Sequence, residues 1–363
     1  MASRTLSLGV IAACLLAAFS GEAVAAGQKS TRKRVVRPKA RSVARSMAKA
    51  PARFVPVTVL VPPEASQYDQ KIAEATRVAL RGRTNVALVA MDPWTGRVLT
   101  VGNPQSGLLT SYQPCSVFKL VVAVAGLTEG VITPESRFNC TEGCWIAQGH
   151  GPVDLRRALA VSCNRYFEML GEKLGFDTVV RYAQKLGLGS PTGVNIPGET
   201  AGAIPSTIPS LGLGHMSAYA QGVKTTAMQL AVLMSALVNG GVMNEPQFVG
   251  PQVIKVKERS RLSAPATLSL LAPGLFSSVT EGSAQRAFDP GFVASGKTGS
   301  CSGVGWFASS LGYPRAEMVV VTFVRGGNGA AAAGVAAEFY RSLLGVQAPT
   351  NGSMLAASPG SQN

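Results

Sequence analysis

Short apolar runs predict strands near both ends of the chain, with helices between them. Runs rich in valine and other strand-forming residues lie at Val57–Val61, Asn85–Met91, Arg97–Val101, Phe292–Gly296, Gly305–Ser310 and Met318–Val324. The second and third runs flank Asp92-Pro-Trp-Thr-Gly96, whose turn-forming residues predict a β-hairpin.

Apolar residues at helical spacing fill most of the remaining sequence. They predict helices at Gln70–Arg81, 116–129, Leu155–Ala160, Asn164–Leu174, 177–187, 226–239 and Ala330–Leu344. The early and late strands are thus separated by a long helical stretch. This order predicts an α+β fold, in which one sheet is built from both ends of the chain and helices are inserted between its halves.

The terminal segments differ in composition from the middle of the chain. Residues 1–25 combine an early charge, an apolar stretch and Ala23-Val-Ala25, which predicts an export signal, either cleaved or kept as an N-terminal anchor. Residues 348–363 are rich in Gly, Ser and Ala and are predicted to be disordered. The folded domain is therefore expected at residues 56–347, in a chain that is 46% hydrophobic.

The positive charge is concentrated before this domain. The chain carries a net charge of +15, and residues 28–54 hold ten Lys or Arg and no acid. Such a block cannot bury enough apolar surface to fold, so residues 26–55 are predicted to be a disordered basic linker. Its charge favours an anionic membrane or cell-wall surface as a partner, whereas export makes nucleic acid an unexpected one.

Ser116 and Lys119 open an apolar run in the first turn of a predicted helix. Positions i and i+3 lie on one face, so the hydroxyl and the amine are expected within hydrogen-bond reach. Apolar surroundings lower the pKa of a lysine, and a neutral Lys119 could then take the proton of a nucleophilic Ser116. The spacing alone is weak evidence, because Ser30/Lys33 and Ser46/Lys49 share it in the basic linker.

Two further motifs follow. Ser162-Cys-Asn164 places a hydroxyl and an amide at the start of a predicted helix, where a proton relay and a substrate ligand, or simply a helix cap, would fit. Lys297-Thr-Gly-Ser300 follows a predicted strand. On an exposed strand its lysine and threonine could bind a carboxylate, and Gly299 permits close approach of a ligand; the alternative is an edge strand with a solvated lysine.

The three motifs, in this order, resemble the signature of the penicillin-binding proteins and serine β-lactamases. The resemblance implies an α/β sandwich, with an antiparallel sheet covered by helices and an all-helical insertion. It also implies roles for the motif residues: Ser116 is the acylated nucleophile, Lys119 its base and Ser162 the proton shuttle. Asn164, Lys297, Thr298 and Gly299 would bind substrate, while the N–H groups of Ser116 and Ser300 would form the oxyanion hole.

The same resemblance bears on the cysteines, of which five follow the predicted signal. It implies a disulfide between Cys115 and Cys301, beside the first and third motifs, which would limit the freedom of the unfolded chain. Cys140 and Cys144 are close enough in sequence to form a second bridge, leaving Cys163 free; alternatively all are buried small residues. His150 and His215 are expected to have structural roles.

The implied function is that of an extracytoplasmic D,D-transpeptidase. It would act on peptidoglycan stem peptides through a Ser116 acyl-enzyme, be inhibited covalently by β-lactams and require neither a metal nor an organic cofactor. A D,D-carboxypeptidase, a serine β-lactamase and a non-enzymatic β-lactam sensor are the alternatives. Class A β-lactamases activate water with a glutamate, and no matching Glu-x-x-Leu-Asn segment follows Asn164.

Overall fold

A six-stranded antiparallel sheet lies at the centre of the fold in the computed structural model, which describes residues 57–141, 144–262 and 265–347. Its strands lie in the order β1-β3-β2-β10-β9-β8. Their bounds are β1 Val59–Leu60, β2 Val86–Met91, β3 Val98–Gly102, β8 Ala294–Cys301, β9 Val304–Leu311 and β10 Met318–Arg325. Pairing of β2 with β10 joins the two ends of the domain, with Val89 opposite Val321.

The alternation of side chains explains why this sheet is covered on both faces. In β2, Ala87, Val89 and Met91 contribute to one hydrophobic cluster. The intervening residues of the same strand, Val86, Leu88 and Ala90, contribute to another. Because successive strand residues point to opposite faces, apolar residues at every position require helices on each side.

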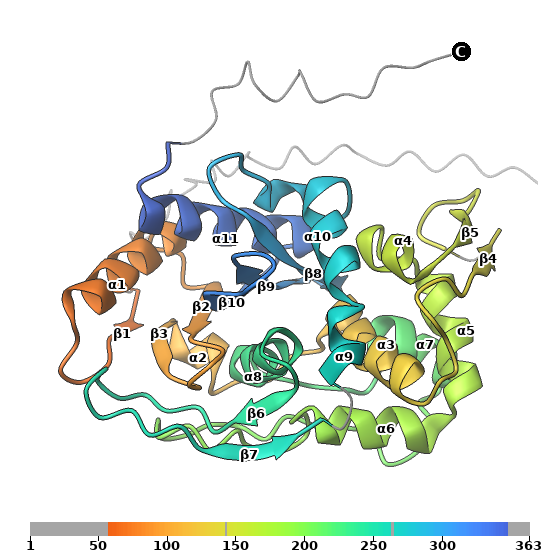
Figure 1. The fold of residues 1–363 in the computed structure, drawn as a ribbon, viewed down its shortest axis with the longest axis horizontal. Helices are drawn as coiled ribbons and strands as arrows, with labels where there is room; N and C mark the ends of the chain where they lie inside the picture. The colour runs from red at the N-terminus through yellow and green to blue at the C-terminus, as the bar shows by residue number, and fades with distance from the viewer. Residues whose placement is uncertain (1–56, 142–143, 263–264, 348–363) are drawn as a thin grey trace, which may run out of the picture. The chain divides into compact units, whose positions relative to one another are not determined.

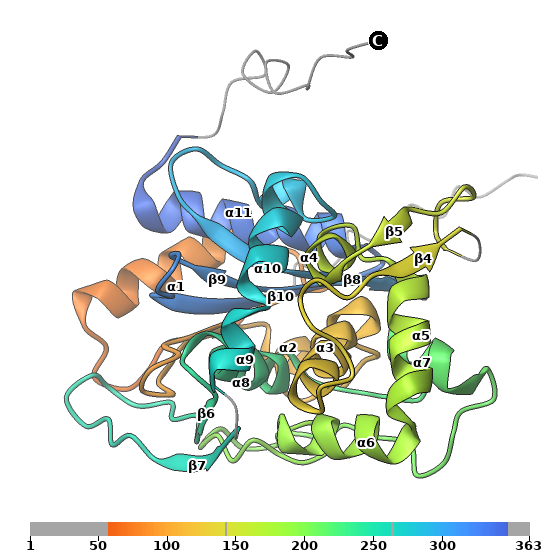
Figure 2. The same cartoon turned by 45° about the vertical axis from the view of Figure 1, so that its right-hand side comes forward.

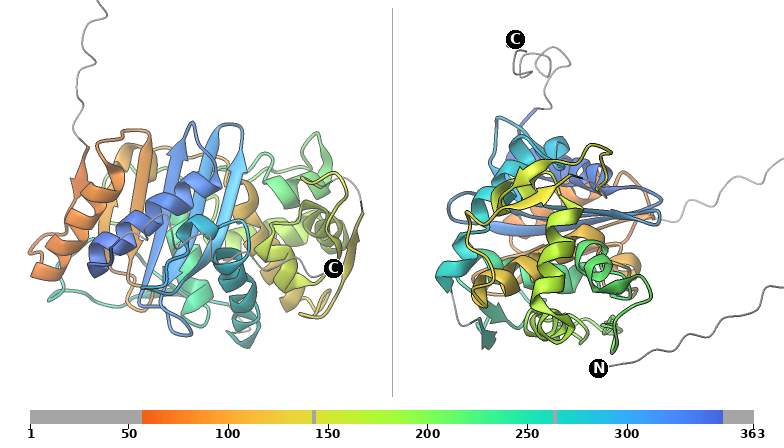
Figure 3. Two further views of the ribbon diagram at one scale, coloured as in Figure 1. Left: turned by 90° about the horizontal axis from the view of Figure 1, so that it is seen from above. Right: turned by 90° about the vertical axis from the view of Figure 1, so that its right-hand side faces the viewer.

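Helices provide the two covering layers, as Figures 1 and 2 show. Helices α1 (Gln67–Leu80) and α11 (Gly329–Leu344) lie across one face of the sheet and are seen over it in the left panel of Figure 3. The helical part between β3 and β8 lies largely on the other side. Its elements are α2 Pro104–Gly107, η1 Cys115–Phe118, α3 Lys119–Thr128, α4 Leu155–Ala160, α5 Asn164–Leu174, α6 Phe176–Lys185, α7 Gly212–Tyr219, α8 Ala227–Val238, α9 Pro265–Ser269, α10 Ala272–Thr280 and η2 Gln285–Ala287.

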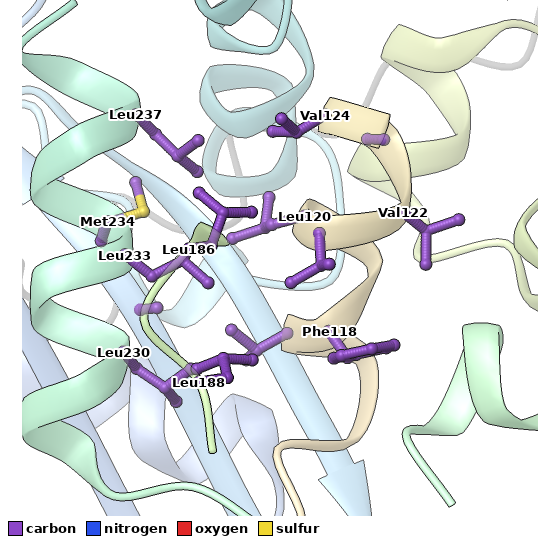
Figure 4. Packing of buried hydrophobic residues seen from close by; sticks show 14 of the residues in the cluster. Phe118, Leu120, Val122, Val124, Leu186, Leu188, Leu230, Leu233, Met234 and Leu237 are labelled. Carbon is purple, nitrogen blue, oxygen red and sulfur yellow. The ribbon is translucent and has the colours of Figure 1, made fainter. Parts of the chain in front are cut away.

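Helix α3 is buried within this helical part. Leu186 and Leu188 lie between α3 and α8, against side chains such as Leu120 and Leu233 (Figure 4). An apolar helix surrounded in this way is held in place by its packing. The residues at its N-terminal end are therefore fixed relative to the sheet.

The predicted α+β architecture is confirmed, and most elements lie where the sequence predicts them. The hairpin of β2 and β3 forms, and α4 and α5 have the predicted bounds. The predicted helix 116–129 is instead a 3-10 turn, η1, followed by α3. Two small hairpins were not predicted: β4 (Phe138–Cys140) with β5 (Gly151–Val153), and β6 (Val242–Asn244) with β7 (Glu258–Arg261).

Several predictions concern segments outside the described residues. These are the export signal at 1–25, the basic linker at 26–55 and the tail at 348–363. Within the residues that the structure describes, no helix combines the length and the apolar character needed to cross a membrane.

Candidate active site

Ser116 lies in the 3-10 turn η1, directly before the buried helix α3. Cys115 precedes it with a φ of 53°, a left-handed conformation that costs energy for a residue other than glycine. The turn brings Ser116 to the wall of a pocket, while the rest of η1 stays in the core. The local strain is consistent with a residue whose position is determined by function.

Lys119 begins α3 and is completely buried. Its Nζ atom lies 2.8 Å from the carbonyl oxygen of Ser162, 3.2 Å from Ser162 Oγ and 2.6 Å from Asn164 Oδ1. Burial lowers the pKa of this amine from 10.5 to about 7. A substantial fraction of Lys119 is therefore neutral near pH 7 and able to accept a proton.

The partners of Lys119 differ from those predicted by helical spacing. In the described part of the chain, the hydrogen bonds of its Nζ atom go to the second motif and none goes to Ser116. Because η1 is a 3-10 turn, the geometry is not that of an α-helical i, i+3 pair. Catalytic hydrogen bonds are often long without substrate, so this difference leaves Lys119 available as a base.

The second motif lies at the N-terminal end of α5. Ser162 has a φ of 56°, the left-handed conformation again, and turns the chain between α4 and α5. Asn164 is buried; its Oδ1 atom accepts from Lys119, and its Nδ2 atom donates to Tyr219 Oη at 2.8 Å. The motif is therefore more than a helix cap, since both of its side chains contact the first motif's lysine.

Lys297 lies inside β8, the edge strand of the sheet, and is completely buried. Its Nζ atom donates to Ser162 Oγ at 2.8 Å and to the carbonyl oxygen of Thr298 at 2.9 Å. Burial, and to a smaller extent the nearby Lys119 amine, hold its pKa well below 10.5. The prediction of an exposed strand is wrong for this residue, because helix α10 packs on β8 through Gly296, whose carbonyl accepts from Ser278.

The remaining residues of the third motif line the pocket at Ser116 or pack against η1. Thr298 Oγ1 lies 2.6 Å from Ser283 Oγ, and Ser300 Oγ accepts from the Gly329 N–H at 2.8 Å. A Cβ atom on Gly299 would lie 2.5 Å from the Pro114 carbonyl oxygen. Glycine is thus needed here for the close approach of β8 to the turn that carries Ser116.

The three motifs meet at a pocket of about 470 Å³. Its lining contains Ser116, Ser162, Asn164, Thr298 and Ser300, together with Trp145, Val161, Tyr219, Ser283, Asn328 and Ala330. The sequence motifs did not identify the second group, which is brought to the pocket by tertiary packing. Tyr219 belongs to none of the three motifs, and its place at the pocket is shown by the lining and by its hydrogen bond with Asn164.

In the structure, Cys115 and Cys301 form a disulfide, with Cα atoms 5.7 Å apart. It joins η1, which carries Ser116, to the end of β8, and this is the pairing that the resemblance implies. The hydrogen bond from Trp306 Nε1 in the neighbouring strand β9 to the Gln113 carbonyl, at 2.8 Å, ties the residues just before η1 to the same sheet.

The other cysteines follow the prediction only in part, since Cys163 is free as predicted but the second bridge does not form. Cys140, Cys144 and Cys163 are free, so the proposed bridge between Cys140 and Cys144 is absent from the described residues. Both thiols lie near a ring nitrogen of His150 instead. His215 stacks on Tyr219 with ring centroids 4.3 Å apart.

Together, the sheet, the helical insertion and the pocket between the three motifs agree with the fold and the motif order of the penicillin-binding proteins. The family model described as "Penicillin binding protein transpeptidase domain" matches residues 86–345, and the chain belongs to this family.

Individual relatives agree with this assignment. The chain is 28% identical over 258 residues to stage V sporulation protein D of Bacillus subtilis, covering 60% of this chain and 40% of that protein. It is 33% identical over 167 residues to the peptidoglycan D,D-transpeptidase MrdA of Haemophilus influenzae, covering 38% and 25%. The chain thus spans well under two thirds of the curated relatives that it matches.

A solved structure has the same fold. The transpeptidase domain of penicillin-binding protein 3 from Burkholderia pseudomallei matches with a TM-score of 0.69 and 20% identity, covering 80% of this chain and 98% of that one.

Proposed function

We propose that this domain is a serine D,D-transpeptidase that acts on peptidoglycan stem peptides and is acylated by β-lactams at Ser116. The observation that carries the proposal is the position of Ser162 Oγ, 3.2 Å from Lys119 Nζ and 2.8 Å from Lys297 Nζ. Two buried amines on one hydroxyl, beside a serine that opens onto a pocket, provide a path for a proton between nucleophile and leaving group.

Acylation begins with attack by Ser116 Oγ on the carbonyl carbon of a peptide or β-lactam amide. Neutral Lys119 accepts the hydroxyl proton as the C–O bond forms. The carbonyl oxygen becomes negatively charged, and the backbone N–H groups of Ser116 and Ser300 would stabilise it. The C–N bond then breaks, leaving an ester on Ser116.

The leaving nitrogen must receive a proton when the C–N bond breaks. Ser162 donates its hydroxyl proton to that nitrogen and regains one from the Lys119 ammonium, so that the proton taken from Ser116 leaves with the amine. In the second half-reaction an acceptor amine attacks the ester, and its proton returns through Ser162 and Lys119 to Ser116 Oγ. Each proton is thereby accounted for without a cofactor.

Substrate recognition would use the side chains of the second and third motifs. Lys297 supplies positive charge when it is protonated, and Thr298 presents a hydroxyl; together they would bind the carboxylate of a D,D-peptide or a β-lactam. The amide of Asn164 would contact the substrate's backbone while it holds Lys119. The short approach at Gly299 keeps these groups next to Ser116.

The segments outside the folded domain fit an extracytoplasmic enzyme. We propose that residues 1–25 direct export and that the basic residues 26–55 attract the domain to an anionic membrane or cell-wall surface. The Cys115–Cys301 disulfide would form in that oxidising compartment.

The test is a donor–acceptor assay with a stem pentapeptide and a D-amino acid acceptor, run in parallel with β-lactam hydrolysis. A transpeptidase forms the exchanged peptide in proportion to the acceptor and hydrolyses β-lactams slowly. Release of shortened peptide alone would indicate a carboxypeptidase, and rapid β-lactam hydrolysis without peptide exchange would indicate a β-lactamase. Acylation without any peptide reaction would indicate a sensor. Ser116→Ala is the control for each reaction.

A further inference from the structure

Four potential metal-binding side chains lie together beside the second motif. They are Cys140 at the end of β4, Cys144 and His150 in the connection to β5, and Cys163 between Ser162 and Asn164. One ligand atom from each residue lies within 4.8 Å of all the others. The sequence did not reveal this cluster, because its members are spread over 24 positions and look like unpaired cysteines in an exported chain.

The distances within the cluster fit coordination of one ion better than a disulfide. His150 Nδ1 lies 3.5 Å from Cys140 Sγ and 3.4 Å from Cys144 Sγ, and the sulfurs of Cys144 and Cys163 are 3.9 Å apart. A disulfide would need about 2.05 Å. Tetrahedral zinc, with Zn–S near 2.3 Å and Zn–N near 2.0 Å, separates its ligands by about 3.5 to 3.8 Å.

The backbone is shaped to bring His150 back to Cys140. Gly149 has a φ of +70°, and a Cβ atom there would lie 1.9 Å from the Cys140 carbonyl oxygen. Cys140 pairs with Gly151 where β4 meets β5. A residue with a side chain at position 149 would therefore separate the histidine from the thiols. Cys140 and Cys163 are buried, which protects the cluster from solvent.

We propose that Cys140, Cys144, Cys163 and His150 bind one zinc ion in a structural Cys₃His site. Three thiolates and an imidazole are soft to borderline ligands that favour zinc over magnesium or calcium. Four protein ligands complete a tetrahedron and leave no open position, as in structural zinc sites. Binding of the ion releases the thiol protons to solvent and forms three Zn–S bonds and one Zn–N bond without any change in oxidation state.

The site would hold the second motif in place. Cys163 joins Ser162 to Asn164, so fixing its sulfur restrains both residues that contact Lys119. Trp145, next to Cys144, donates from Nε1 to the Val161 carbonyl at 3.0 Å and lines the pocket. Zinc therefore acts here as a positioning device for the pocket, and takes no part in the acyl transfer itself.

The first test is metal analysis of the purified full chain by inductively coupled plasma mass spectrometry. We expect about one zinc ion per chain, retained through gel filtration. After removal of the zinc by a chelator, addition of Co²⁺ alone should give a blue-green protein. Its absorption spectrum should show thiolate-to-cobalt charge transfer and the d–d bands of a tetrahedral site. Neither readout depends on acylation, so the result is separate from the proposed function.

Variants assign the ligands. Cys140→Ser and His150→Ala should lose zinc and the cobalt spectrum, while Cys115→Ala combined with Cys301→Ala, which removes two other cysteines, should keep both. If a variant fails to fold, thiol titration of the wild-type protein takes the place of that test. Removal of the zinc by a chelator should then raise the reactivity of three thiols.

Three results would overturn the proposal. Wild-type protein without metal, and with a mass lowered by the two hydrogens of a disulfide among Cys140, Cys144 and Cys163, would show that the cluster is a redox pair. Three free thiols without zinc binding would show a packed cluster only. Iron or copper in place of zinc would refute the choice of ion.

Discussion

Lys297 Nζ lies 2.8 Å from Ser162 Oγ, although 135 residues separate them in the chain. This contact joins the last motif to the second, and Lys119, 3.2 Å from the same hydroxyl, adds the first. Ser162 is thereby the point at which the three motifs meet. In the mechanism proposed above, this arrangement lets a single hydroxyl on a strained turn serve both halves of the acyl transfer.

Removing this hydroxyl should slow acylation more than it weakens binding. We expect Ser162→Ala to lower the acylation rate by a β-lactam by roughly 10²- to 10⁴-fold, the usual contribution of a proton-transfer group. The measurement is stopped-flow acylation over a range of β-lactam concentrations. Ser162→Gly, which also relieves the positive φ, should be equally slow; recovery of the rate by glycine would mean that backbone conformation, and not the hydroxyl, matters.

The pKa of Lys119 predicts how acylation depends on pH. Burial lowers this pKa to about 7, and only the neutral amine can act as a base, so the rate should rise with pH through about 7 and then level off. Lys297, Glu168, Cys144 and Cys163 are the other titratable groups near it. A profile that is flat, or that falls with pH across this range, would exclude Lys119 as the base.

The same shift predicts the sign of a stability change. The pKa of Lys119 in the folded chain lies below its value in the unfolded chain. Between about pH 7 and pH 10.5 the unfolded chain therefore binds more protons than the folded chain. The free energy of unfolding should therefore include a contribution from Lys119 that is fully present above pH 10.5 and is lost as the pH falls to about 7. Lys119→Met should remove this pH dependence in urea unfolding, and an unchanged slope would contradict it.

Gly299 tests the fit of β8 against the nucleophile turn. In Gly299→Ala the new Cβ would lie 2.5 Å from the Pro114 carbonyl, so we expect a loss of about 1–3 kcal/mol of stability and slower acylation. Gly334→Ala is the matched control, since nothing lies within 4 Å of its Cβ in helix α11. It should be stabilised by about 0.5–1 kcal/mol. Equal effects of the two variants would refute the steric account.

The disulfide should contribute to stability through the unfolded chain. It links residues 186 positions apart, and the chain-entropy argument gives at most about 5 kcal/mol for such a loop. Replacing Cys115 and Cys301 together by Ala should lower the melting temperature measured by differential scanning fluorimetry. A reducing agent should have the same effect on the wild-type protein and none on the double variant. An unchanged melting temperature on reduction would mean that the bond is not formed.

Much of the fold could be predicted because its signals are local. The valine-rich strands β2 and β10 alternate between two cores, and Asn164–Leu174 carries a helical pattern that the structure reproduces. The motif residues were recognisable from the order of the three motifs along the chain and their resemblance to the penicillin-binding proteins, since the spacing of Ser116 and Lys119 alone is shared by chance pairs. Their contacts were not: Lys119 turns toward Asn164 and Lys297 is buried, because tertiary packing decides both.

The thiol cluster was missed for a related reason. Cys140 and Cys144 are near in sequence, which suggested a bridge, whereas the positive φ of Gly149 brings His150 to them and the start of α5 brings Cys163. Neither a backbone reversal of this kind nor helix placement leaves a periodic pattern. Tertiary packing likewise brings Tyr219 and Ser283 to the pocket from distant segments of the chain.

The central claim is that Ser116 is acylated within this pocket. Its most direct test is a time course of intact mass with benzylpenicillin, followed by peptide mapping. The account predicts an adduct of about one penicilloyl group per chain on Ser116, long-lived compared with its formation, and no adduct in Ser116→Ala. An adduct on another residue, or none with any of several β-lactams, would contradict it.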